Sequence, residues 1–286
     1  MPRRSSIGGH LGNGKLTDSY VPVAVCAVGE RAPCSSNLSE VTAIAAGEGF
    51  SVALLKNGTV VAWGENHYGQ LGNGSTTFSD VPVAVCAVGE KAPCSHDLSE
   101  VSATAAGAGD SLALLKNGTV VAWGYNAAGQ LGTGRTTGPE ECSGRTACSK
   151  IPVPVSNLSE VSAIAAGAGY SMALLKNGTV KAWGENEGGQ LGDGSTEPSD
   201  VPVVLSDLSE VSAISAGAGD SLALLKSGTV MSWGENNYGQ LGDGSSSGPE
   251  ECTDGACSRT PVPVSALSGV SSISAGEGSE LAIGHL

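Results

Sequence analysis

The chain is short of basic residues, long apolar runs and aromatic side chains. Its 286 residues contain 14 Lys and Arg against 28 Asp and Glu, which gives a formal net charge of −14. A surface of this sign repels phosphate backbones, so the composition argues against a nucleic-acid partner. No apolar run approaches the roughly 18 residues of a membrane-spanning helix. The basic start MPRRSSIGGH has no apolar stretch behind it, so we do not interpret it as a signal peptide.

Helical periodicity is also missing, whereas glycine is abundant. No segment of useful length repeats its apolar residues at helical spacing. Aromatic residues make up only 4% of the chain, and 43 glycines accompany many Val, Thr and Ser. This mixture is typical of short strands joined by tight turns. Because 40% of the residues are hydrophobic, such strands can still bury a core.

Several phrases recur along the chain. All four tryptophans precede a glycine and lie 60, 60 and 50 residues apart, at Trp63, Trp123, Trp183 and Trp233. The phrase GQLGxG follows each of them, at 69–74, 129–134, 189–194 and 239–244, and a fifth version, GGHLGNG, covers 8–14. The phrase AGxG begins at Ala46, Ala106, Ala166, Ala216 and Ala275. Self-similarity of this kind predicts a repeat architecture.

One repeat is expected to form four short antiparallel strands. In the third full copy these are 161–167, 171–176, 179–184 and 201–205. Asn177-Gly178 predicts a two-residue hairpin turn with two positive φ angles. Pro202 removes a ladder donor, which suits an edge strand. Four-stranded units repeated around an axis are the blades of a β-propeller, and an open β-solenoid is the structural alternative.

The segment SLALLKNGTVVAWGYNAAGQLGTG (111–134) resembles the repeat of the regulator of chromosome condensation family. The resemblance covers nearly the whole chain outside the cysteine-containing insertions. It implies an all-β protein, a β-propeller of four-stranded antiparallel blades. Members of the family usually have seven blades, whereas this chain has four full repeats and a split fifth. There are three possible interpretations: a five-bladed ring, an open arc and a fragment of a longer propeller. We favour the last two, because a closing blade would have to use PRRSSI as its third strand, and this segment is poorly suited to form a strand.

The phase of the repeats gives the domain organisation. We expect a single repeat domain over 1–286. We also expect that its terminal blades, which lack a neighbouring blade, can mediate self-association. The approximate repeat units are 1–40 (partial), 41–98, 99–158, 159–208, 209–268 and 269–286 (partial).

Eight cysteines form four close pairs, each within one insertion: Cys26 with Cys34, Cys86 with Cys94, Cys142 with Cys148, and Cys252 with Cys257. Their even number and local pairing predict four disulfides, each closing a loop worth about 2–3 kcal/mol. Disulfides indicate an oxidising compartment. Zinc sites and reduced thiols are the alternatives; a structural zinc site needs four ligands, and no histidine lies at ligand spacing beside any pair.

The sequence offers no catalytic, metal or cofactor site. Each histidine has a different position in its repeat and is expected at the surface; they are His10, His67, His96 and His285. The glycine-rich phrases precede strands, so they supply no helix N-terminus for a phosphate. We therefore predict a protein that is not an enzyme and that needs no cofactor.

Differences between the repeats suggest a binding face. The four tryptophans themselves are expected to pack between neighbouring blades. The residue after AGxG and the loop after Trp-Gly both lie opposite the Asn-Gly turn, hence at one end of the hairpin. These variable positions carry most of the other aromatics and two carboxylates: Phe50, Tyr68, Asp110, Tyr125, Tyr170, Asp220 and Tyr238. Aromatics among carboxylates on a rigid surface suit protein recognition, and neutral drift at loop ends is the alternative.

Three functions are compatible with these observations. The first is a non-catalytic, extracellular or cell-surface module that binds an unidentified protein. Within the family it resembles secreted bacterial repeat proteins, one of which inhibits β-lactamase through one face of its ring. The second is guanine-nucleotide exchange on a small GTPase, the founding activity of the family, which the acidic charge disfavours. The third is a structural repeat segment of a larger surface protein.

Overall fold

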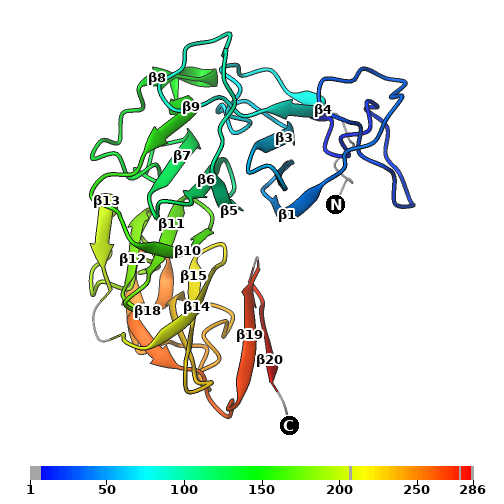
Figure 1. The fold of residues 1–286 in the computed structure, drawn as a ribbon. Coiled ribbons are helices and arrows are strands. Elements are labelled where there is room, and N and C mark those ends of the chain that lie inside the picture. The colour runs from blue at the N-terminus through cyan, green and yellow to red at the C-terminus, as the bar shows by residue number, and fades with distance from the viewer. Residues whose placement is uncertain (1–7, 206–207, 277, 285–286) are drawn as a thin grey trace. The chain divides into compact units, whose positions relative to one another are not determined.

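A computed structural model describes residues 8–205, 208–276 and 278–284, and it is built almost entirely of short antiparallel strands (Figure 1). One short 3-10 helix, η2 (Ser143–Arg145), lies in a loop. The all-β prediction is therefore confirmed. Among these residues no helix has the length and apolarity to cross a membrane. The chain divides into two compact units, Met1–Ala127 with Thr137–Pro154, and Ala128–Thr136 with Val155–Leu286. The prediction of a single domain over the whole chain stays a prediction.

Unit 1 contains two sheets, each with its strands in antiparallel order. The first is four-stranded: β1 (Val41–Ala46), β2 (Phe50–Leu55), β3 (Val60–Gly64) and β4 (Ser79–Ala84). The second is five-stranded, in the spatial order β5 (Val101–Ala106), β6 (Asp110–Leu115), β7 (Val120–Tyr125), β9 (Ala147–Pro154) and β8 (Glu140–Glu141).

Unit 2 contains three sheets. The first is β10 (Val161–Ala166), β11 (Tyr170–Leu175), β12 (Val180–Gly184) and β13 (Ser199–Val204). The second is β14 (Val211–Ala216), β15 (Asp220–Leu225), β16 (Val230–Glu235), β18 (Gly255–Pro263) and β17 (Glu250–Cys252). The third is the two-stranded sheet β19 (Val270–Ala275) and β20 (Glu280–Gly284).

The second and third strands of each full repeat form its core. In the first full repeat every residue of β3 is buried, and in β2 only Ser51 and Leu55 are partly exposed. These strands are buried on both faces, which is why Ser-x-Ala-Leu-Leu and Val-x-x-Trp-Gly read as nearly continuous small and apolar runs. The proline-bearing fourth strands β4 and β13 lie at sheet edges, as Pro202 predicts.

The turn between these strands differs from the prediction. Asn177 does not have a positive φ, whereas Gly178 has a φ of 85°. Leu175 N–H donates to the Thr179 carbonyl, and Gly178 N–H donates to the Leu175 carbonyl. The loop is therefore three residues long, with its glycine in the left-handed region, and the two-residue turn with two positive φ angles is wrong. Asn177 instead accepts the Thr179 N–H through its side chain at 3.0 Å.

Each tryptophan joins its repeat to the preceding repeat. Its indole N–H donates to a backbone carbonyl of the preceding repeat. The acceptor is the Gln of Gly-Gln-Leu-Gly or, in the first case, the His of Gly-His-Leu-Gly, both of which are written GxLG below. The pairs are Trp63 to His10 (3.1 Å), Trp123 to Gln70 (2.9 Å), Trp183 to Gln130 (2.8 Å) and Trp233 to Gln190 (2.9 Å). In the three Gln cases the serine beside the tryptophan, on the second strand, donates to the same carbonyl: Ser111, Ser171 and Ser221.

A glycine packs closely against each indole. A Cβ on the last glycine of GxLG would lie 2.7–2.8 Å from the tryptophan Nε1, at Gly12, Gly72, Gly132 and Gly192. We call this glycine, together with the Gln or His carbonyl, the tryptophan socket. The tryptophans are at most 7% exposed, so the socket packs one repeat against the next.

Residues 8–40 carry the first socket but no named strand. The segment VPVAV (21–25) has the sequence of a fourth strand, yet only an isolated bridge between Cys26 and Asn37 forms in its vicinity. The predicted third strand of this repeat, PRRSSI, which would pair with it, lies outside the described residues.

The cysteines pair as the sequence predicts. The bonds are Cys26–Cys34, Cys86–Cys94, Cys142–Cys148 and Cys252–Cys257, with Cα–Cα distances of 5.6–5.9 Å. The last two close hairpins in which β8 pairs with β9 and β17 pairs with β18. Two blades therefore have five strands where four were expected, because an insertion that precedes the fourth strand extends the sheet.

Candidate functional site

The seven residues of the predicted binding face divide by burial. Four of them are at most 2% exposed and open the second strands: Phe50 in β2, Asp110 in β6, Tyr170 in β11 and Asp220 in β15. Tyr68 and Tyr125 are partly buried, and Tyr238 is 86% exposed. A solvent-facing role for the first four is therefore wrong. Protein recognition by the three tyrosines stays a prediction.

Two of the side chains that open the second strands, Phe50 and Tyr170, contact the following repeat. The Phe50 ring fills space left by Gly47, where a Cβ would collide with the ring and lie 2.5 Å from the Gly107 carbonyl. The Tyr170 hydroxyl donates to the Asp220 carbonyl at 2.6 Å and lies 2.9 Å from the Ser221 hydroxyl.

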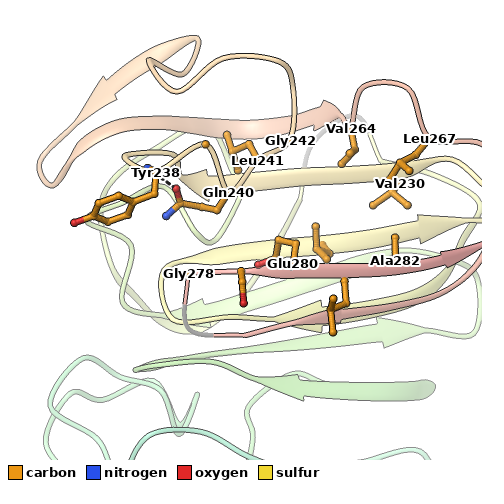
Figure 2. Close-up of a pocket in the computed structure, with 14 residues that line it drawn as sticks. Val230, Tyr238, Gln240, Leu241, Gly242, Val264, Leu267, Gly278, Glu280 and Ala282 are labelled. Carbon is orange, nitrogen blue, oxygen red and sulfur yellow. Dashed lines mark hydrogen bonds between the residues drawn. The ribbon is translucent and has the colours of Figure 1, made fainter. Parts of the chain in front are cut away.

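The three tyrosines lie in or next to the loops after Trp-Gly. In unit 1 the rings of Tyr68 and Tyr125 come from consecutive repeats and meet edge to face, with centroids 4.9 Å apart. In unit 2 Tyr238 stands at the rim of a pocket and points away from the other lining side chains (Figure 2). The loop after Trp-Gly therefore presents aromatic surface in both units.

Asp110 is an unusual group in the core of unit 1. Its side chain is fully buried, and neither carboxyl oxygen has a hydrogen-bond partner in the described structure. Burial raises the pKa of Asp110 well above its ordinary value. The folded protein therefore holds a proton here at pH values where the unfolded chain has released it.

We expect the Asp110→Asn variant to melt at a higher temperature than the parent at pH 7. Its melting temperature should also change less with pH than that of the parent. Because the pKa of Asp110 is raised, the folded state binds more protons, and the free energy of unfolding falls as pH rises above about 4. The neutral amide removes that dependence. Thermal melts by circular dichroism between pH 4.5 and 7.5 measure the effect, with the exposed Asp97→Asn as the control. An unchanged slope in Asp110→Asn would contradict the assignment.

Unit 2 contains a second carboxyl group with a raised pKa. Burial raises the pKa of Glu280 to about 10, and the neighbouring Asp220 carboxyl raises it further. Burial also raises the pKa of Asp220. Glu280 occupies the place in its repeat that Ser221 occupies in the preceding repeat, since Ala275 pairs with Glu280 as Ala216 pairs with Ser221.

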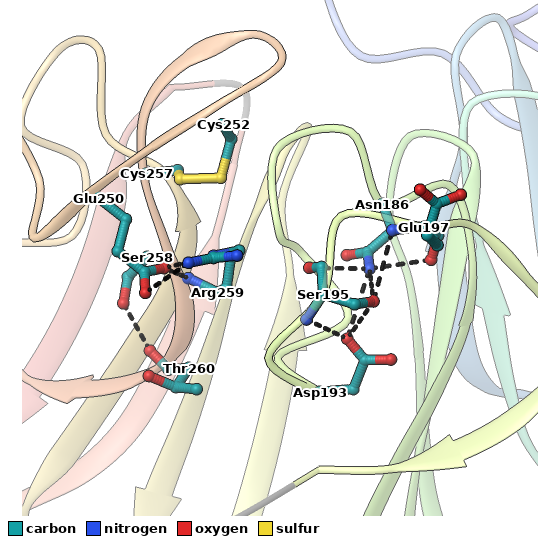
Figure 3. A network of polar contacts seen from close by, with 10 residues as sticks. All are labelled: Asn186, Asp193, Ser195, Glu197, Glu250, Cys252, Cys257, Ser258, Arg259 and Thr260. Carbon is teal, nitrogen blue, oxygen red and sulfur yellow. Dashed lines mark hydrogen bonds and ion pairs between the residues drawn. A yellow bond between two sulfur atoms is a disulfide. The ribbon is translucent and has the colours of Figure 1, made fainter.

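Buried amide side chains hold the loops after Trp-Gly in shape. Asn186 accepts the Leu191 N–H at 2.9 Å and donates to the carbonyls of Ser195 and Glu197 (Figure 3). Its counterparts at the same position are also fully buried: Asn66, Asn126 and Asn236. This asparagine is not among the residues predicted from the sequence, although its recurrence in every copy of Trp-Gly-x-Asn was a visible signal.

Carboxylates gather around the same loops in unit 2. Burial raises the pKa values of Glu185 and Glu235, and neighbouring negative charges raise them further. For Glu185 these neighbours are Glu187, Asp254 and Glu235. The side chains of Glu187 and Asp254 are exposed, so this end of the unit carries concentrated negative charge.

No catalytic constellation appears in the described part of the chain. No group of three His, Cys, Asp or Glu residues could hold a metal ion there. His10 lies 3.4 Å from Glu65 and is 27% exposed, and His96 lies 2.7 Å from Glu90 at the surface. His67 is exposed, and His285 lies outside the described residues.

Comparison with known proteins identifies the repeat. The family model for the RCC1-like domain matches residues 7–285. The chain is 32% identical over 191 residues to the E3 ubiquitin-protein ligase HERC2 of mouse and of human, which is 65% of this chain and 4% of HERC2. It is 30% identical over 184 residues to the ultraviolet-B receptor UVR8 of Arabidopsis thaliana, 64% of this chain and 36% of UVR8. The chain thus spans a small part of the curated relatives it matches.

Solved structures share the fold. Human WBSCR16 superposes with a TM-score of 0.75 at 20% identity, covering 98% of this chain and 66% of that protein. Prp20p of Saccharomyces cerevisiae superposes with a TM-score of 0.69 at 20% identity, covering 94% and 59%. The resemblance seen in the repeats is confirmed, and the chain belongs to the RCC1-like domain family of β-propellers.

Proposed function

We propose that this chain is a non-catalytic protein-binding module, and that it binds basic protein surfaces through the loops after Trp-Gly. The observation that carries the proposal is the composition of these loops in unit 2. They combine the exposed ring of Tyr238 with the carboxylates of Glu185, Glu187 and Glu235, and the charge of Asp254, in the turn between β17 and β18, acts on Glu185 and Glu235.

The scaffold beneath these loops favours recognition over chemistry. Asn186 and Asn236 fix the loop backbones through buried hydrogen bonds, so little conformational entropy is lost when a partner binds. The carboxylates attract a cationic partner at long range, and the aromatic ring supplies contact area.

A structural neighbour provides a precedent for protein binding. Prp20p has binding properties toward Gsp1p and histones. Histones are basic proteins, and this chain carries a net charge of −14. At 20% identity the neighbour shares the fold, so the partner class proposed for this chain rests on its own carboxylates.

Reversing two exposed charges is expected to weaken binding to core histones about tenfold, or about 1.4 kcal/mol, at low salt. The variant is Glu187→Lys with Asp254→Lys, because both side chains are exposed. Fluorescence anisotropy with labelled histones at two salt concentrations measures the dissociation constant. Tyr238→Ala is expected to weaken binding without changing its salt dependence.

The matched control carries the same change of net charge elsewhere on unit 2. Glu160→Lys with Glu210→Lys removes exposed ion pairs to Lys176 and Lys226, each 2.8 Å long, at the turn before the first strand. Equal losses in both double variants would show that only net charge matters and would reject the loop site. Acceleration of GDP release from a small GTPase would favour exchange activity instead.

We place this activity outside the cell or at its surface. Four local disulfides support an oxidising compartment, since such bonds rarely persist in a reducing cytosol.

A further inference from the structure

The turn between the second and third strands has one sequence in three of the four full repeats. It reads Asn-Gly-Thr at 57–59, 117–119 and 177–179, and Ser-Gly-Thr at 227–229. Asparagine followed two residues later by threonine or serine is the acceptor sequence for N-linked oligosaccharides in secreted proteins. The turn lies at the opposite end of the hairpin from the loop after Trp-Gly, so the proposed function leaves it without a role.

The three turn asparagines are oriented alike. Their side chains are exposed, and in each the Oδ1 atom accepts the N–H of the threonine two residues later at 3.0 Å. At Asn57 and Asn117 the threonine hydroxyl also donates to Oδ1, at 2.7 Å. The amide oxygen therefore faces the turn, and the amide nitrogen Nδ2, on the other side of the same carbon, takes no part in these hydrogen bonds.

A sugar on Nδ2 is compatible with this geometry. It would replace one hydrogen of the amide and leave the hydrogen bonds to Oδ1 in place. An N-linked oligosaccharide is bulky, so it needs open space around its acceptor. Each turn asparagine follows an exposed lysine, which shows that the chain beside it is also open to solvent: Lys56, Lys116 and Lys176.

The fourth repeat has the same turn without the asparagine. The turn glycine has a φ of 81–85° in all four full repeats, at Gly58, Gly118, Gly178 and Gly228. Its N–H donates to the leucine carbonyl three residues earlier, at 2.8–2.9 Å in each repeat. Ser227 is exposed in the place of the asparagine. The fourth repeat therefore provides a comparison in which only the acceptor amide is missing.

Asn73 also matches the acceptor sequence, with Gly74 and Ser75, but it is held differently. Its side chain is partly buried, and its Oδ1 accepts from Nδ2 of the buried Asn66 at 3.3 Å and from the Ser75 hydroxyl at 3.0 Å. Asn66 is one of the residues that fix the loops after Trp-Gly. Asn73 thus belongs to a loop interior, where a bulky sugar has little space.

We propose that Asn57, Asn117 and Asn177 are acceptors for N-linked oligosaccharides, one on each of three consecutive repeats. The inference rests on the extracellular placement proposed above, because this modification belongs to secreted proteins. The donor is an oligosaccharide carried on a polyprenyl pyrophosphate. Asparagine Nδ2 forms a bond to C1 of the first sugar, the bond from C1 to the pyrophosphate oxygen breaks, and one amide proton is released as the lipid pyrophosphate leaves.

The position of these sugars would leave the proposed binding loops open. In each hairpin the sugar occupies the end at the Asn-Gly-Thr turn, and the loop after Trp-Gly occupies the other end. The turn end also carries an exposed Lys–Glu ion pair in each of these repeats. A bulky sugar beside each pair would keep other proteins from the turn end of the hairpin.

The first experiment uses the protein isolated from the organism that produces it. Peptide N-glycosidase releases the sugar and converts each modified asparagine to aspartate, so digestion in heavy-oxygen water labels the modified positions. Mass spectrometry of the resulting peptides is expected to show labelled aspartate at Asn57, Asn117 and Asn177 and unmodified asparagine at Asn73. Unmodified asparagine at all three turn positions would overturn the proposal, and so would labelling of Asn73 to the same extent as the turns.

The second experiment adds an acceptor to the fourth repeat. The full chain is secreted from cultured eukaryotic cells with a secretion signal added. It carries Asn37→Gln and Asn157→Gln, because these exposed asparagines precede Leu-Ser outside the hairpin turns. Ser227→Asn restores Asn-Gly-Thr and is expected to raise the count from three sugars per molecule to four, by intact mass before and after peptide N-glycosidase.

Ser227→Gln is the matched control and is expected to keep three sugars, because its amide lies one methylene further from the turn and is not part of an acceptor sequence. Circular dichroism verifies that each variant is folded. A count that stays at three in Ser227→Asn would contradict the proposal, because the turn would then not be what presents the acceptor.

Histone binding separates this inference from the proposed function. The secreted protein is expected to bind core histones equally before and after the sugars are removed, because they lie at the other end of each hairpin. Sugars at the turns of a protein that does not bind histones would support the acceptor sites and reject the proposed partner class. Histone binding by a native protein without sugars at the turns would overturn the acceptor sites alone.

Discussion

Replacing Trp233 with alanine is expected to lower the free energy of unfolding by about 3–5 kcal/mol, the range typical of removing a large buried aromatic side chain. Trp233 is fully buried, and its indole N–H donates to the Gln190 carbonyl at 2.9 Å. The variant loses the packing of the indole among Tyr170, Leu191 and Leu205 in the core of unit 2. It also leaves the Gln190 carbonyl with only the Ser221 hydroxyl as a donor.

Urea unfolding followed by far-ultraviolet circular dichroism measures this loss. Tyr238→Ala serves as the control, because it removes an aromatic side chain of the same repeat that is 86% exposed, and surface changes usually stay within about 0.5 kcal/mol. A loss below about 1 kcal/mol for Trp233→Ala would mean that the sockets do not hold the repeats together.

The repeat made much of the fold predictable from the sequence. Phrases such as Lys-Asn-Gly-Thr and Trp-Gly recur at one phase, so strand order and hairpin pairing follow from local rules applied repeatedly. The cysteine pairs were predictable for the same reason, since each pair closes a loop of its own insertion, with sequence separations of 5 to 8.

The candidate site was less predictable, because burial depends on the neighbouring repeat. Phe50 and Tyr170 stand at a strand end, where a single repeat would expose them, and the next repeat covers them. Asp110 is also fully buried although its side chain is an acid, so its chemistry gave no warning of its burial. The acceptor for each indole is a backbone carbonyl, which any residue type can supply. The only sequence feature that marks the contact is the glycine that makes room for the ring.

Two glycines in one phrase allow the socket to be tested from its other side. Gly192 and Gly194 have φ angles of 68° and 87°, so alanine at either position costs about 1–2 kcal/mol for a left-handed backbone. A Cβ on Gly192 would lie 2.7 Å from Trp233 Nε1, whereas a Cβ on Gly194 would meet nothing within 4 Å. We expect Gly194→Ala to cost about 1–2 kcal/mol and Gly192→Ala to cost about 1–3 kcal/mol more, because the indole must move. If urea unfolding gave equal losses of unfolding free energy for Gly192→Ala and Gly194→Ala, the socket would accommodate a Cβ without displacing the indole.

Combining the substitutions assigns that extra cost to a single contact. If Gly192→Ala destabilises the protein by displacing the indole, the collision disappears once Trp233 is alanine. In the Trp233→Ala background Gly192→Ala should then cost no more than Gly194→Ala, and the coupling energy of the cycle should be about 1–3 kcal/mol. Gly194→Ala should show no coupling to Trp233→Ala, since its Cβ has no neighbour. The same cycle cannot be built at Gly242, where none of the described indoles lies.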